Sequence, residues 1–404
     1  MSKLFEIALG LVTGIGGFLE AGSLATAAQA GAAFGYQLIW AIAVGTVCIA
    51  FLVEMAGRLA AVSHHTLPDA MRERFGIAFF LVPLAVVVVV SFLVLASEIG
   101  GVTLALEFTT GVSHRWWAIP AALALWLLLW KGSFGMVEKG TSMLGLVTLA
   151  FVVAAFKLHP APGEVAAGLL PRAPSHDPAK YWFTAVSIVG ASVSPYLFYF
   201  YSAGAVEDQW DEGYLGINRI TAGLGMTFGG AVAVAALVCA ALVLHTRGIE
   251  VDRYEQITFL LASPLARAGF WLFAGALFIA CFGAALEIAL QLAYLVAQGF
   301  GWRWGENLRP REAARFALVY TVALPLAALV IAAGIDPLKL TVMSMALTAL
   351  SLPVTVVPLL VLMNDPQYLN EHTNGWVSNV AVLAVSIIAC LVALVALPLQ
   401  VFGS

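Results

Sequence analysis

The chain has 404 residues, of which 62% are hydrophobic and 10% are charged, and its mean hydropathy is +0.96. Soluble domains are nearer half apolar and a quarter charged, so this composition excludes a soluble globular protein and indicates an all-α, polytopic membrane protein in a lipid bilayer. The net charge of -4 is small and no basic run is present, which excludes a nucleic-acid partner.

Apolar runs long enough to cross a bilayer, which takes about 20 residues, recur along the whole chain. We expect eleven of them, at about 5–33, 36–60, 77–106, 115–131, 136–158, 181–205, 216–245, 266–299, 312–333, 337–363 and 376–402. The longest loops are expected at 159–180 and 246–265. No cleavable signal is expected, because the first apolar run serves as its own insertion signal.

Lysines and arginines indicate the orientation of these spans. With the N-terminus inside, the short loops 61–76 and 300–311 carry the basic clusters on the cytoplasmic side. We therefore expect a cytoplasmic N-terminus and an external C-terminus, in an integral protein of the bacterial inner membrane.

The stretch 14–26 of the first span has one carboxylate, Glu20, with glycines on both sides at 14, 16, 17 and 22. A charge at the centre of a bilayer costs roughly 2.5–3.5 kcal/mol on insertion scales, so it needs a partner or a cavity. Glycine has little helix propensity, so the segment can unwind where the carboxylate lies. The sequence therefore predicts a helix break at Glu20 that faces a transported solute.

The sixth span has a second interruption, at residues 190–196, where Pro195 removes a backbone amide and obstructs the preceding turn. Interruptions in the first and the sixth span, which are five positions apart in the order of spans, are the pattern of two inverted five-helix repeats. In that pattern the solute site lies between the first helices of the two repeats. We expect one membrane domain over 1–404, with repeats at about 5–158 and 181–363 and an extra helix at about 376–402.

The polar groups near these two breaks are oxygen ligands. Glu20 and Ser23 are three residues apart and share a face if the segment is locally helical, with Gly22 between them. Ser194 adds a hydroxyl, and the second break frees the backbone carbonyl of Ala191. Such oxygen ligands suit Mg, Ca or Mn, and a single carboxylate suits an ion that keeps much of its water. Packing of small residues at helix contacts is the alternative for both serines.

Two further acids lie deep in apolar spans, Glu98 in the third and Glu287 in the eighth. An acid inside the membrane is a functional-site hypothesis by default, and either could exchange a proton during transport. The alternative for each is a neutral carboxyl bonded to a helix backbone. Glu287 could also be a second acid for the solute. Arg315, at the start of the ninth span, is expected to cap the cytoplasmic pathway or to pair with an acid.

Several segments resemble the NRAMP (natural resistance-associated macrophage protein) divalent-metal transporters. They are residues 21–40, Arg58-Leu59, residues 67–76, Glu98-Ile99-Gly100, Ser194-Pro195, Ser202-Ala203, Leu352-Pro353 and Pro358-Leu359-Leu360. The resemblance covers most of the chain. It implies a leucine-transporter-like fold of eleven helices and uptake of a solute toward the cytoplasm, coupled to protons or running downhill.

The chain departs from this family at the motifs that hold the metal. The first-helix motif Asp-Pro-Gly-Asn is replaced by Glu20-Ala21-Gly22-Ser23, and the sixth-helix motif Met-Pro-His by Ser194-Pro195-Tyr196. Met345 aligns with a glutamine of the family in the tenth span, on the solute pathway. Glu98 matches a position linked to proton movement, whose histidine neighbour is Tyr196 here, and tyrosine does not titrate near neutral pH. The resemblance thus indicates a divergent branch.

We expect a secondary transporter, acting by alternating access, for a hard divalent cation such as Mg or Mn. A transporter of the same fold for a small organic solute, with the metal site lost, is the alternative. A sensor would normally add a soluble output domain. No pairing of catalytic residues lies at membrane depth, so an enzyme is not expected, nor is a cofactor. A monomer is expected, with protons as a further partner.

Overall fold

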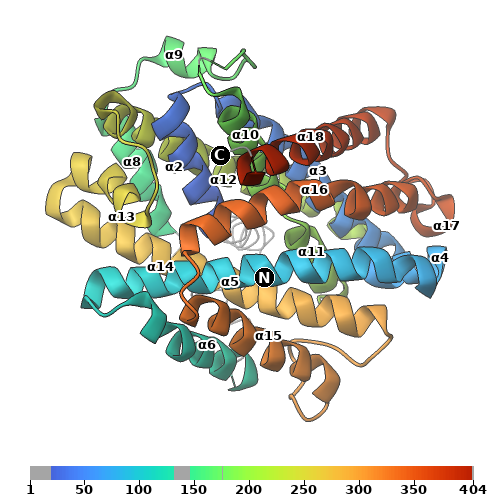
Figure 1. The fold of residues 1–404 in the computed structure, drawn as a ribbon. Coiled ribbons are helices and arrows are strands. Elements are labelled where there is room, and N and C mark those ends of the chain that lie inside the picture. Colours follow the sequence, from blue (N-terminus) through green and yellow to red (C-terminus); the bar gives the residue numbers. More distant parts are fainter. Residues whose placement is uncertain (1–19, 132–145, 175, 403–404) are drawn as a thin grey trace.

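The computed structural model describes residues 20–131, 146–174 and 176–402, and every regular element in these ranges is helical (Figure 1). Several sequence expectations fall outside them: the glycines before Glu20, the beginning of the fifth span, and Lys3 and Lys139, which contributed to the orientation.

The helices follow the apolar runs of the sequence. Those in the expected spans are α2 (Ala21–Phe34), α3 (Ile39–Ser63), α5 (Ile77–Thr110), α6 (His114–Lys131), α8 (Leu149–Lys157), α10 (Pro178–Ser192), α11 (Pro195–Glu207), α12 (Leu215–Val243), α14 (Phe259–Gly299), α15 (Ala314–Ala332), α16 (Pro337–Met363) and α18 (Trp376–Phe402). Those between the spans are α4 (Leu67–Phe75), α9 (Pro162–Ala167), α13 (Tyr254–Ile257) and α17 (Pro366–Leu369). The 3-10 turns are η1 (Leu146–Thr148), η2 (Glu212–Tyr214) and η3 (His245–Arg247).

Eight helical segments of the described chain are long and apolar enough to cross a membrane, which makes this an integral membrane protein. They are Ile39–Ser63, Ile77–Thr110, Pro178–Glu207, Glu212–Arg247, Phe259–Gly299, Ala314–Ala332, Pro337–Met363 and Trp376–Gln400. Helices α2, α6 and α8 lie in three further expected spans and are not among these eight. The total of eleven spans stays a prediction.

The sixth span is interrupted where the sequence predicts it. Helix α10 ends at Ser192, Val193 leaves the helical region with φ -112° and ψ 59°, and α11 begins at Pro195. In the first span, Glu20 is extended with φ -124° and ψ 173°, and α2 begins at the next residue. The first and the sixth span therefore each have a helix end at the predicted site.

The predicted loop at 246–265 is wrong in its last part. Helix α14 already begins at Phe259 and continues past Pro264 through a kink at Ala266, where φ is 53°. The proline and the charges of this stretch suggested a loop. Residues on both sides of Ala266 are nevertheless helical, so a short helical segment that begins at Phe259 precedes the kink.

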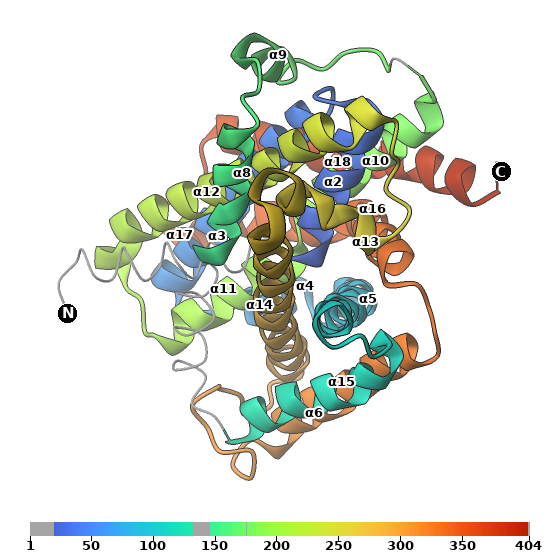
Figure 2. The same ribbon diagram turned by 90° about the vertical axis from the view of Figure 1, so that its left-hand side faces the viewer.

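The long helices surround the start of α2 and the break between α10 and α11. Helix α5 packs along α14, α2 packs against α10, α12 and α16, and α10 packs against α16. Helices α6 and α15 lie side by side at one edge, and α9 lies at the opposite edge (Figures 1 and 2). The two helix ends are thus enclosed by packed helices on several sides.

A polar network joins α3 to the segment before α18. Glu54 and Arg58, four residues apart in α3, form an ion pair with the guanidinium 3.0 Å from the carboxylate. Arg58 also donates to the backbone oxygen of His372 at 2.7 Å and to the side-chain oxygen of Asn374 at 2.6 Å. One half-buried guanidinium therefore links two segments that are more than 300 residues apart in sequence.

Arg58→Gln is expected to lower the free energy of unfolding by about 1–3 kcal/mol, because it leaves partly buried acceptors unpaired. The matched control is Arg74→Gln, since the Arg74 side chain is 45% exposed and pairs with Asp365 at 2.7 Å. An exposed pair contributes about 0–1 kcal/mol. Unfolding in detergent compares the two variants, and equal losses would contradict the structural role of the Arg58 network.

Candidate cation site

Glu20 lies at the start of α2, where its side chain meets the break between α10 and α11. The residue is 2% exposed. The hydroxyl of Ser194 donates to its Oε1 atom at 3.2 Å, and the side chain of Tyr196 is also hydrogen-bonded to it. The sequence prediction that Glu20 and Ser194 come together is therefore seen in the structure.

The second oxygen of this carboxylate has no hydrogen-bond partner among the described residues. The Oε2 atom of Glu20 is buried, and none of the ion pairs in this part of the chain involves Glu20. A buried oxygen of a carboxyl group is costly without a hydrogen bond or a counter-charge. A proton or a cation can satisfy it.

The backbone carbonyl of Ala191 faces the same break. In a continuous helix it would accept from the amide four residues later, but that residue is Pro195, which has no N–H. The Ser194 hydroxyl lies 3.4 Å from this carbonyl and 3.3 Å from that of Gly190. One hydroxyl therefore bridges the Glu20 carboxylate and the open end of α10, so that three kinds of oxygen lie close together.

Ser23 and Gly22 occupy the first turn of α2, next to Glu20. Both are buried. The Gly22 carbonyl accepts a hydrogen bond from the hydroxyl of Thr26 at 2.7 Å, a contact that the sequence did not suggest. Met345 of α16 packs against Gly22 so closely that a Cβ atom there would lie 2.5 Å from its sulfur. Met345, which the sequence analysis expects on the solute pathway, thus contacts the start of α2, next to Glu20.

Glu98 of α5 lies directly beside this helix end. Both of its carboxylate oxygens accept from the backbone amide of Ala21, each at 3.1 Å. The first amides of a helix have no partner within the helix and carry partial positive charge, so a carboxyl group satisfies them. Glu98 therefore holds the start of α2, which is the backbone bonding that the sequence left open as the alternative to a proton carrier.

Sequence reasoning missed Cys281, which is hydrogen-bonded to Glu98 from α14. The four cysteines all lie in apolar runs, and nothing in the sequence separates this one from ordinary core residues. The thiol comes close because α5 and α14 pack tightly, and a Cβ atom added at Gly101 would meet the Cys281 sulfur. The contact depends on two helices that meet only in the folded chain.

Glu287 lies on α14 within electrostatic reach of Tyr196 and is buried. Arg315 is elsewhere: its guanidinium lies over the ring of Trp302, 5.4 Å from the centroid, and forms none of the ion pairs found among the described residues. The structure thus brings Glu287 toward the site. Arg315 makes a cation–π contact, and its expected place at the cytoplasmic pathway stays a prediction.

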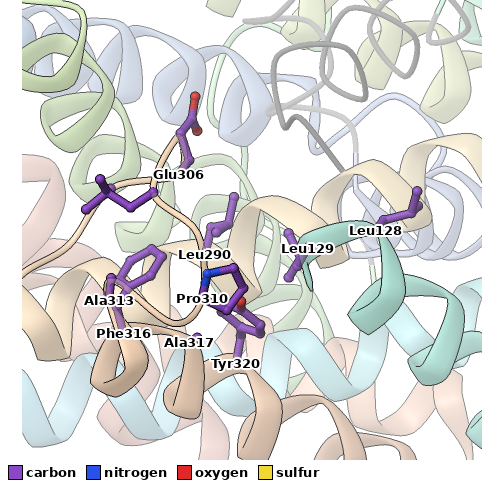
Figure 3. A pocket seen from close by; sticks show the side chains of 11 residues that line it. Leu128, Leu129, Leu290, Glu306, Pro310, Ala313, Phe316, Ala317 and Tyr320 are labelled. Carbon is purple, nitrogen blue, oxygen red and sulfur yellow. The ribbon is translucent and has the colours of Figure 1, made fainter. Parts of the chain in front are cut away.

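Two cavities of the described structure lie away from Glu20. One, lined by apolar residues of α6, α14 and α15 and by Glu306, holds about 20 Å³ for the centre of a water molecule, which is room for one water (Figure 3). A larger groove of about 390 Å³ lies beside the other end of α2, where Tyr36, Arg172 and His245 border it. Neither of these two cavities includes Glu20 in its lining.

The carboxylate of Glu20, the hydroxyl of Ser194 and the carbonyl of Ala191 form an oxygen cluster. This oxygen cluster differs from a site built of several acids, histidines and cysteines. Within the ranges that the structure describes, no three such side chains gather in a metal-binding group. Glu20 instead combines with a hydroxyl and a backbone carbonyl. Ligands of this kind suit a cation that favours oxygen, and an ion that keeps part of its hydration shell needs few protein ligands.

Known proteins resemble the chain over nearly its full length. The family model described as "Natural resistance-associated macrophage protein-like" matches residues 10–398. The divalent metal cation transporter MntH of Vibrio campbellii is 24% identical over 400 residues, which is 96% of this chain and 91% of that protein. MntH of Klebsiella pneumoniae is 24% identical over 391 residues, covering 93% and 90% of the two chains.

Solved structures share the fold. A manganese transporter of Eremococcus coleocola superposes with a TM-score of 0.82 at 20% identity, covering 98% of this chain and 87% of that one. Mhp1, a nucleobase-cation-symport-1 family transporter in a closed conformation, gives a TM-score of 0.62 at 15% identity and covers 96% and 91%. These likenesses show that the helices are arranged as in that group of transporters.

Proposed function

The chain belongs to the natural resistance-associated macrophage protein-like family, and from that membership we propose that it transports a divalent metal cation across the membrane. The observation that carries this proposal is the Oε2 atom of Glu20, which is buried without a partner among the described residues and lies beside the open end of α10. The relatives named MntH and the manganese transporter support the class of solute.

The ligands favour a cation of the Mn²⁺ or Mg²⁺ type. Glu20 supplies one carboxylate, Ser194 a hydroxyl and Ala191 a carbonyl, and Ser23 lies one turn along α2. All are hard oxygen donors, and the single negative charge suits an ion that keeps several waters. Imidazole and thiolate ligands, which suit zinc and copper, are not part of this set.

Transport requires the site to open toward each side in turn. The break between α10 and α11 and the start of α2 provide helix ends that can move without breaking a continuous helix. We place these two ends at the first helices of two repeats, over about 5–158 and 181–363, in a monomer whose N-terminus is cytoplasmic. Glu98 and Glu287, both within electrostatic reach of Tyr196, are the groups through which protons could be coupled to the cation.

The test is uptake of Mn²⁺ into liposomes that contain the purified protein. We expect saturable uptake that competes with Mg²⁺ or other oxygen-favouring ions, and heat of binding on titration with Mn²⁺. Flat titrations with Mn²⁺, Mg²⁺ and Ca²⁺ together with no uptake would overturn the proposal and would favour an organic solute.

Ser194→Ala is expected to weaken Mn²⁺ binding by about 0.5–1.5 kcal/mol, roughly 3- to 10-fold, because it removes one hydroxyl ligand and the bond to Glu20. Ser187→Ala is the matched control, since Ser187 is a buried serine of the adjoining helix α10 whose hydroxyl donates to the carbonyl of Phe183 at 2.9 Å. Titration calorimetry compares the variants. An equal loss in both would mean that packing of α10, rather than a ligand, is responsible.

A further inference from the structure

One face of α14 is polar although it is buried. Glu287, Gln291, Tyr294 and Gln298 are spaced by four, three and four residues, which places them on a single stripe of the helix. Glu287 is 8% exposed, Tyr294 is 2% exposed, and the two glutamines are fully buried. Polar side chains are rarely buried in a membrane protein without a role.

Two members of this stripe, Glu287 and Tyr294, interact with residues of α11. The Tyr294 hydroxyl donates to Glu207, the last residue of α11, at 2.7 Å, and its ring lies 6.1 Å from that of Phe200. At the other end, Glu287 is within electrostatic reach of Tyr196, in the first turn of α11. The polar stripe of α14 therefore runs beside α11 from the candidate cation site to the end of that helix.

The two glutamines have amide groups that no described residue satisfies. The nitrogen and the oxygen of both Gln291 and Gln298 are buried, and all four atoms have no hydrogen-bond partner in the ranges that the structure describes. A bare cation would bind the amide oxygens and leave the nitrogens without an acceptor. Water can donate to the oxygen and accept from the nitrogen, so it fits all four atoms.

We propose that a row of bound water molecules lies between α11 and α14 and conducts protons between the candidate cation site and the expected cytoplasmic face. Both ends are acidic: Glu287 is at the central end, with Glu20 and Glu98 beyond it. Glu207 and Glu306 are at the other end, where the carboxylate of Glu207 accepts from the backbone amide of Glu306 at 3.2 Å.

Two other charged groups flank the cytoplasmic end of the row. Arg72 donates to the backbone oxygen of Gln298 at 2.9 Å, and its guanidinium pairs with Asp69 at 3.1 Å. The acidic groups at both ends favour a positive species over hydroxide. Each water then accepts one proton and passes another to its neighbour. One proton moves from water at the centre to water at the surface, with no net change in the protein.

Radiolytic hydroxyl labelling tests the water row without measuring transport. Water bound beside a buried side chain produces radicals that modify it. We expect Tyr294 to be oxidised several-fold faster than Tyr254, which is equally buried but bonds to Thr341 and lies outside the stripe. Gln291→Leu should lower the rate at Tyr294 to that at Tyr254. Equal rates at the two tyrosines in the unaltered protein would overturn the proposal.

Proton flux tests whether the water row conducts protons. This test rests on the proposed cation transport, because cation uptake supplies the driving force for proton movement. In liposomes with an internal pH dye, Mn²⁺ uptake should be accompanied by acidification, which Gln291→Leu and Gln298→Leu lower several-fold while Mn²⁺ binding persists. Gln367→Leu, at an exposed position of α17, is the matched control and should behave as the unaltered protein.

The outcomes separate this inference from the proposed function. Mn²⁺ uptake without acidification, or acidification unchanged in both leucine variants, overturns the proton route and leaves metal transport standing. Absence of Mn²⁺ binding and uptake overturns the proposed function, and the labelling of Tyr294 then still supports or overturns the water row.

Discussion

Glu20→Gln is expected to weaken Mn²⁺ binding by about 2 kcal/mol or more, roughly 30-fold, and to stop uptake into liposomes. The substitution keeps the size of the side chain and removes the charge of the one acidic group in the oxygen cluster. An amide oxygen still accepts from the Ser194 hydroxyl, so the contact between α2 and the break can persist. The loss is therefore expected in binding and transport.

Stability separates this loss from misfolding. Because the Oε2 atom of Glu20 has no partner in the described structure, the variant should unfold in detergent at the same temperature as the unaltered protein, or higher. Glu250→Gln is the matched control, since Glu250 is 58% exposed and pairs with Lys180 at 2.8 Å. Normal Mn²⁺ affinity in Glu20→Gln would remove this residue from the site, and with it the proposed ligand set.

Gly190→Ala is expected to destabilise the protein by about 1–3 kcal/mol or more and to abolish transport, because the position has no room for a methyl group. A Cβ atom at Gly190 would lie 1.8 Å from the backbone oxygen of Met345. That atom belongs to α16 and cannot turn aside as a side chain would, so α10 and α16 must separate. The same stretch of α16 contacts Gly22, which extends the disturbance to the start of α2.

Gly223→Ala is the control for the added methyl group. Gly223 lies in α12, and a Cβ atom there would meet nothing within 4 Å. Alanine favours helix more than glycine does, so this variant should be as stable as the unaltered protein or slightly more stable. Thermal unfolding in detergent and Mn²⁺ uptake measure both variants. If Gly190→Ala kept full stability, the close crossing of α10 and α16 would have to be rejected.

Local features of the sequence account for the helices and for the break in the sixth span. Apolar runs of sufficient length predict helices in a bilayer because backbone groups there must bond within the chain. Pro195 predicts the interruption because it lacks an amide, and α11 begins at this residue. At 259–265 the expectation of a loop was wrong, because these residues, Pro264 among them, are helical and the chain leaves the helical region only at Ala266.

The sequence alone predicts the membrane class, most helix positions, and Glu20 and Ser194 as partners across two helix ends. These features depend on charge, hydropathy and proline, which act locally. Three features followed only from the packed structure: Glu98 caps α2 through Ala21, Met345 packs on Gly22, and one face of α14 carries amides that no described residue satisfies. These contacts join residues far apart in the chain. They depend on which helix faces meet when the bundle packs, and no local pattern specifies that.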